Sequence, residues 1–152
     1  MRRIFPAFLL VVMIFSLSAC TGNQTFVLKD FQRDISFETG GITVKGSLDC
    51  KTWDKITFTV KEPENISGIV FTTDEISAED IKINYGKTGE RSPVKMLLMI
   101  LSDMASKEIS IPLKGEYTHT DEFSSAGYKV VFDCEKSEIK SIETDKYTYN
   151  FE

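Results

Sequence analysis

Three cysteines and a single histidine are the side chains of this sequence best suited to nucleophilic or metal chemistry. A thiol can be acylated, oxidised to a disulfide or bound to a metal, and its surroundings decide which of these happens. Cys20 follows a long apolar segment, whereas Cys50 and Cys134 each end a run of alternating apolar residues. The sequence therefore predicts that the Cys20 thiol undergoes a different reaction from the thiols of Cys50 and Cys134.

The residues before Cys20 have the three parts of a secretion signal. Residues 1–3 are positively charged, residues 4–15 are apolar or small, and residues 17–19 are a leucine followed by two small side chains. The apolar run is too short for a transmembrane helix, which needs about 20 residues. The segment is therefore expected to direct export of the chain.

Leu17, Ser18, Ala19 and Cys20 resemble the lipobox of bacterial lipoproteins, each residue at its own position. The resemblance implies cleavage between Ala19 and Cys20 and attachment of a diacylglyceryl group to the Cys20 thiol, with fatty acyl chains such as palmitate. Several acyl chains anchor a protein stably, because each buried methylene contributes about 0.8 kcal/mol. We expect a lipoprotein on the extracytoplasmic face of the cell membrane. An ordinary secretory signal and an uncleaved anchor are the alternatives.

The exported part of the chain is acidic. Loss of Arg2 and Arg3 from the 18 basic residues leaves 16 against 23 acidic residues, a net charge near −7. Nucleic acid requires a basic face, so no nucleic-acid partner is expected. The length predicts three parts: residues 1–19 as a signal peptide, residues 20–30 as a lipidated N-terminus and tether, and residues 31–152 as one domain.

Cys50 and Cys134 are predicted to face the core, because each continues the apolar phase of its alternating run. Disulfides persist outside the cytoplasm, so the two could pair. Such a bond would close a loop of about 84 residues and stabilise the fold by up to about 4 kcal/mol. Two separate buried thiols are the alternative.

His119 lies in a polar stretch that we interpret as an exposed loop. A serine-type catalytic site requires a nucleophile on a sharp turn, and the sequence has no G-x-S-x-G motif. One histidine and two core-facing thiols exclude zinc sites of familiar spacing. The acidic pairs at 74–75 and 79–80 lack the glycine loop of a calcium site and suit a soluble strand connection. No enzyme, metal or cofactor is expected.

Alternation of apolar and polar residues dominates the domain and predicts strands with one buried face. The pattern becomes helical once, where Ser92 can cap a helix and Pro93 suits its first turn. This helix is apolar almost all round, so it must be buried on more than one side. We predict a mainly β (α+β) fold: a single curved antiparallel sheet, an open half-barrel of about eight or nine strands, with one principal helix on its concave face.

Three stretches resemble the small LolA-like (lipoprotein-localisation-factor-like) lipoproteins of Gram-positive bacteria. They are residues 35–48, residues 57–69 with their strand, proline-acid turn and glycine, and the glycine-led strand at 127–133. Members of that family have an open half-barrel closed by helices around an apolar cavity, and some carry lipid or lipoprotein acyl chains. The resemblance implies the same fold and ligand class for residues 31–152.

An apolar cleft between helix and sheet is the functional prediction. Methionine gives a soft surface suited to varied apolar ligands. The candidate lining residues are Phe58, Phe71, Met96, Met99 and Met104. The predicted function is a membrane-anchored lipoprotein that binds a lipid or acyl chain there. The alternative is a non-enzymatic module that docks on an envelope protein, and a Met-rich helix that only fills the core would fit that alternative. A hydrolase with an unrecognised site is a third hypothesis.

Overall fold

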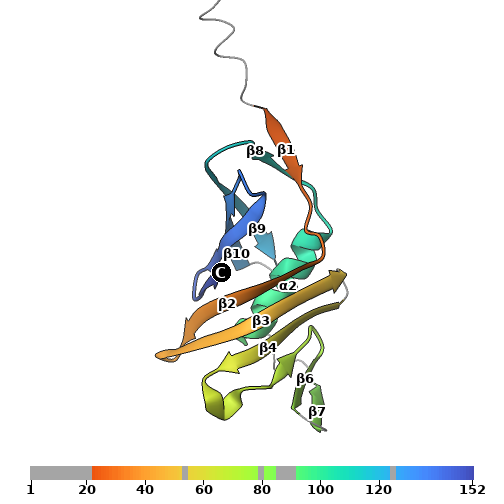
Figure 1. Ribbon diagram of the computed structural model, residues 1–152, viewed down its shortest axis with the longest axis vertical. Coiled ribbons are helices and arrows are strands. Elements are labelled where there is room, and N and C mark those ends of the chain that lie inside the picture. The colour runs from red at the N-terminus through yellow and green to blue at the C-terminus, as the bar shows by residue number, and fades with distance from the viewer. Residues whose placement is uncertain (1–21, 53–54, 79–80, 85–91, 124–125) are drawn as a thin grey trace, which may run out of the picture.

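The computed structural model describes residues 22–52, 55–78, 81–84, 92–123 and 126–152. Most of them form strands, and a helix packs against the strands (Figure 1). In chain order the elements are β1 (Asn23–Phe26), β2 (Phe31–Thr39), β3 (Ile42–Thr52), β4 (Lys55–Glu62), the 3-10 turn η1 (Glu64–Ile66), β5 (Val70–Phe71), β6 (Glu75–Ala78), β7 (Ile81–Asn84), α2 (Pro93–Ala105), β8 (Ile109–Pro112), β9 (Glu116–Phe123), β10 (Ala126–Asp133), β11 (Glu138–Thr144) and β12 (Thr148–Phe151).

The main sheet is open and antiparallel, with the strand order β7-β6-β5-β4-β3-β2-β12-β11-β10-β9. Strands that are neighbours in this sheet are also consecutive in the chain, except for β12 and β2, whose pairing joins the two halves of the sheet. β1 and β8 form a separate two-stranded sheet. The predicted mainly β fold with a large antiparallel sheet and a helix is confirmed. The sheet has ten strands rather than eight or nine, and a second small sheet accompanies it.

The alternating residues of neighbouring strands share one face, as the sequence pattern predicts. In β2 and β3, Phe37 pairs with Val44 and Ile35 pairs with Gly46, and Ile35, Phe37 and Val44 are all buried. Gly46 is required at its position, because a Cβ there would clash with the Phe58 ring and with a backbone carbonyl of β4. The absence of a side chain at Gly46 thus lets the Phe58 ring approach the backbone of β3 closely.

Helix α2 is held at both ends by tyrosines of the sheet. The Tyr149 hydroxyl donates to the backbone carbonyl of Pro93 (2.7 Å), and the Tyr128 hydroxyl donates to the Asp103 carboxylate (2.9 Å). Pro93 occupies the first turn as predicted, but the Ser92 side chain makes no capping hydrogen bond. Its backbone carbonyl instead accepts from the amide of Met96 (3.0 Å).

The space between helix and sheet is filled with apolar side chains. Every buried side chain of the described residues is hydrophobic, tyrosine and cysteine included. The helix contributes Val94, Leu97, Leu98, Ile100, Leu101 and Met104 to this core. Leu97, Leu98 and Leu101 are fully buried, as is Phe58 on the facing sheet. The helix therefore packs on the sheet through these buried side chains.

The tether predicted for residues 20–30 is wrong at residues 23–26. Residues Asn23–Phe26 form β1, which pairs with β8, and Phe26 is buried against the Phe132 ring at a centroid distance of 4.8 Å. The Gln24 amide adds hydrogen bonds to the carbonyls of Cys134 (2.5 Å) and Pro112 (3.2 Å). The folded domain therefore begins before Phe31, because a short polar strand is fixed by partners far away in sequence.

The acidic pair at 74–75 lies at the turn that connects β5 to β6, in a strand connection as predicted. Glu75 begins β6, which pairs with both β5 and β7, and the Thr72 hydroxyl accepts the amide of Glu75 at the turn (3.0 Å). Lys82 of β7 forms an ion pair with Glu75 at 3.4 Å. The second acidic pair, 79–80, lies outside the described residues.

Candidate functional site

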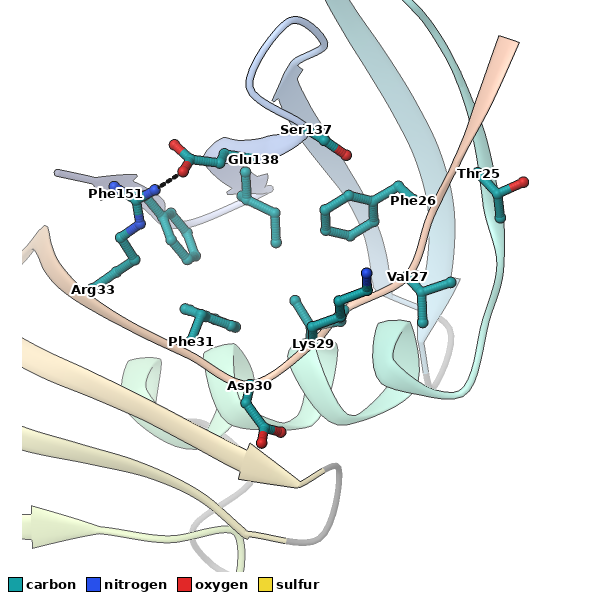
Figure 2. A pocket seen from close by; sticks show the side chains of 12 residues that line it. Thr25, Phe26, Val27, Lys29, Asp30, Phe31, Arg33, Ser137, Glu138 and Phe151 are labelled. Carbon is teal, nitrogen blue, oxygen red and sulfur yellow. Dashed lines mark ion pairs between the residues drawn. The ribbon is translucent and has the colours of Figure 1, made fainter.

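A cavity of about 250 Å³ opens beside the segment that joins β1 to β2. It forms because β1 leaves the main sheet to pair with β8, so residues 27–30 pass over a gap between β2 and the start of β11 (Figure 2). The lining residues are Thr25, Phe26, Val27, Leu28, Lys29, Asp30, Phe31, Arg33, Ser137, Glu138, Ile139 and Phe151. We call this space the β1 cavity.

The floor of the β1 cavity is apolar. Phe26 is buried, and the other floor residues, Leu28, Phe31, Ile139 and Phe151, are half-buried side chains packed against the core. They come from four strands and the connecting segment, so the tertiary fold alone brings them together. Half-buried aromatic and aliphatic side chains around an open space are suited to an apolar ligand.

The mouth of the β1 cavity carries charge. Arg33 and Glu138 form an ion pair across it, drawn as the dashed line in Figure 2. Figure 2 also shows the Lys29 amine directed toward the space beside Phe26, whereas the Asp30 carboxylate points the opposite way. Within the described residues Lys29 has no ion pair or hydrogen-bond partner, so its charge is available to a ligand.

The five residues of the predicted helix–sheet cleft do not share a cavity among the described residues. Phe58 and Met104 belong to the filled core, and Phe71 packs on Phe58 at a ring centroid distance of 6.5 Å. Met96 and Met99 line a separate cavity of about 210 Å³, together with Ile100, Phe123, Ala126, Gly127, Tyr128 and Thr144. Phe58 and Met104 are almost completely buried, and neither lines this second cavity.

A charged cluster fixes the end of helix α2 to the β9–β10 hairpin. The Lys107 amine lies 2.6 Å from both the Asp103 and the Asp121 carboxylates. These hydrogen bonds, that of Asp103 first, raise the pKa of Lys107, and Lys107 lowers the pKa of Asp121. Burial, followed by the hydrogen bond to Asp103, raises the pKa of Tyr128. One ammonium group lies between two carboxylates, and its hydrogen bonds join the end of helix α2 to the hairpin, so we interpret the cluster as structural.

His119 lies in strand β9, not in the predicted loop, and pairs in register with Val130. Its side chain is about three-quarters buried (26% exposed), and its Nε2 atom lies 3.8 Å from Asp121. None of the cavities described above is lined by His119. Over the described residues, no group of three or more potential ligands could hold a metal ion.

Cys50 and Cys134 are separate buried thiols, which is the alternative to the disulfide. Strands β2, β12 and β11 lie between β3 and β10. Strands are spaced by about 4.8 Å and a disulfide requires Cα atoms within about 7 Å, so four spacings along the sheet are too many. Burial raises the pKa of both thiols, that of Cys50 to about 11.

Comparison of the chain with known protein families, curated proteins and solved structures finds no match. No helix among the described residues has the length and apolar character to cross a membrane. Cys20 and the cleavage position at Ala19 lie outside the described residues. The sequence does not predict the β1 cavity, because its pattern predicts a tether over residues 20–30. The apolar run Phe26-Val27-Leu28 within that segment was the available signal.

Proposed function

We propose that this chain is a lipoprotein anchored through Cys20 on the extracytoplasmic face of the cell membrane, and that its domain binds an acyl chain in the β1 cavity. The apolar floor is the observation that carries the binding proposal. The LolA-like resemblance implies an acyl-chain ligand, but members of that family hold it in a cavity closed by helices, whereas the β1 cavity lies beside the segment that joins β1 to β2.

The position of the β1 cavity supports this proposal. Thr25 lines the cavity and follows Cys20 by five residues, a span of at most about 17 Å for an extended chain. A lipidated Cys20 would therefore hold the cavity close to the membrane surface, where acyl chains are available. At about 250 Å³ the cavity is smaller than a typical ligand pocket of roughly 300–1,000 Å³. It would take part of a chain while the remainder stays in the bilayer.

A docking module remains the second candidate, and the filled interior of the domain favours it. The middle of the interface between helix α2 and the sheet is filled, because Leu97, Leu98 and Leu101 are fully buried there. Strand β9 also ends the sheet with an eight-residue edge that no described strand covers. Such an edge can pair with a strand of another protein.

Photocrosslinking of an acyl probe tests the first candidate. The full-length lipidated protein in phosphatidylcholine nanodiscs would receive palmitic acid bearing a diazirine, and the adducts would be mapped by mass spectrometry. We expect adducts on the peptides around Phe31 and Ile139. Leu28→Trp fills the cavity and should lower this labelling several-fold, while Met99→Trp in the second cavity is the matched control.

Circular dichroism would verify that both variants fold, since overpacking costs about 1–3 kcal/mol. Loss of labelling in Met99→Trp alone would move the site to the methionine cavity. Absence of any adduct on the wild-type domain would contradict acyl binding and leave the docking module.

A further inference from the structure

Lys29 lies at the mouth of an apolar cavity and has no ion-pair partner among the described residues, and acyl binding as such does not require a cation there. The other cation of the lining, Arg33, is neutralised by Glu138. The Asp30 carboxylate is directed away from the cavity in Figure 2. Within the described residues the mouth therefore presents one positive charge without a protein counterion.

The apolar floor suits the chain of an amphiphile, and the Lys29 ammonium group suits an anionic headgroup. We infer that the β1 cavity selects amphiphiles whose headgroup is anionic, with Lys29 contacting the headgroup and the floor residues contacting the chain. The inference rests on the proposed acyl binding and adds the class of headgroup.

The exposure of Lys29 sets the size of the expected selection. Lys29 is solvent-exposed, so water screens its charge, and an exposed ion pair contributes up to about 1 kcal/mol, equivalent to about fivefold in binding. A neutral headgroup would leave the Lys29 amine hydrated at little cost. A cationic headgroup would be repelled.

A carboxylate and a phosphate monoester share the required chemistry, because both accept hydrogen bonds from an ammonium group. The source of the ligand is then either a free fatty acid or a phosphate-bearing lipid. A comparison of headgroups on one chain length distinguishes the two.

The test uses the full-length lipidated protein in phosphatidylcholine nanodiscs. Diazirine-bearing palmitic acid, hexadecyl phosphate, hexadecanol and hexadecylamine would be crosslinked separately, and adducts on the cavity peptides quantified. We expect the two anionic probes to label the cavity about fivefold more than hexadecanol, and hexadecylamine to label it least. The stronger of the two anionic probes identifies the source of the ligand.

Variants of Lys29 separate charge selection from mere partition into the bilayer. Lys29→Gln should abolish the preference for anionic probes while leaving hexadecanol labelling unchanged, and Lys29→Arg should retain the preference. Lys82→Gln removes the same charge from β7 at the far edge of the sheet and should change nothing.

Two outcomes would overturn the inference and leave acyl binding intact: equal labelling by anionic and neutral probes in the wild type, or a preference that survives Lys29→Gln. If none of the four probes labels the cavity, the proposed function itself fails.

Discussion

At the scale of single residues, Lys107 holds the end of helix α2 on the sheet. Its amine bridges Asp103 at the end of helix α2 and Asp121 in β9, and the Tyr128 hydroxyl donates to the same Asp103 carboxylate. Hydrogen bonds of Lys107 and Asp103 therefore link α2, β9 and β10. Each hydrogen bond is charge-assisted, and the side chains are only about one-third exposed or less, so the cluster is screened less than a fully exposed pair.

The Lys107 cluster predicts a pH-dependent contribution to stability. Lys107→Met should lower the free energy of unfolding by about 1 kcal/mol at pH 7, measured by urea titration. The lowered pKa of Asp121 means that this contribution is present above the ordinary carboxyl pKa and lost as the pH falls through the folded-state pKa. The difference between wild type and variant should therefore shrink below about pH 3.

The raised pKa of Lys107 also limits the contribution of the cluster to stability at alkaline pH. This contribution is complete below the ordinary lysine pKa and is lost only as the pH rises through the folded-state pKa of Lys107. Lys82→Met, which breaks the exposed pair with Glu75, is the control and should change stability little. A variant difference that stays constant down to pH 2 would argue against this assignment.

Cys20 is the residue on which the anchoring proposal depends. Cys20→Ala should abolish incorporation of a fatty-acid analogue, because Cys20 is the one thiol in the expected lipobox. Metabolic labelling followed by gel analysis measures this. Cys50→Ala is the matched control and should label as the wild type does, since Cys50 is buried in the domain. Equal label in Cys20→Ala and wild type would contradict the lipoprotein assignment.

At the scale of elements, β1 makes a mostly polar segment part of the folded domain. Three interactions hold it there: the pairing with β8, the packing of Phe26 on Phe132, and the hydrogen bonds of Gln24. It also creates the β1 cavity, because its departure from the main sheet leaves the space that residues 27–30 cross. The same strand therefore serves stability and the candidate site.

Phe26→Ala should destabilise the protein by about 3 kcal/mol, because it removes a buried ring and leaves a cavity. Val27→Ala, at the neighbouring position with a side chain 39% exposed, should change the free energy of unfolding by about 0.5 kcal/mol or less. Thermal or urea unfolding measures both. A neutral Phe26→Ala would mean that residues 23–26 are a tether after all.

At the scale of the whole molecule, one core joins both halves of the sheet. β12 pairs with β2, so the N-terminal and C-terminal strands share their inner face, and helix α2 packs over the junction through Pro93 and Tyr149. Cys50 and Cys134 lie in this single core although they are far apart in the sheet. A continuous core predicts one cooperative unfolding transition.

The reactivity of the Cys50 and Cys134 thiols measures this unfolding transition. At pH 8 both should resist iodoacetamide in the folded protein, because they are buried and their pKa values are raised, that of Cys50 to about 11. In urea both should be alkylated together as the protein unfolds, as counted by mass spectrometry. Rapid alkylation of one thiol in the folded state would contradict the single core. Failure of both to react in urea without reductant would restore the disulfide.

The sequence by itself determined those features that depend on local pattern. The alternation of Ile35, Phe37 and Val44 fixes which strand faces are buried, and Pro93 with the apolar run after it marks the start and content of the helix. The expected signal segment also depends on order and charge alone. Such features can be predicted because the physical cause acts between residues close in the chain.

Only the tertiary structure decided where side chains distant in sequence meet. Met99 and Phe58 have the same apolar character, yet one lines a cavity and the other lies in a filled core. Phe26, Phe31 and Ile139 form a floor only because β1 leaves the sheet and the start of β11 lies beside the gap. No local pattern carries that information, since cavities arise where packed elements fail to fill the space between them, and this depends on the relative placement of the whole set of strands.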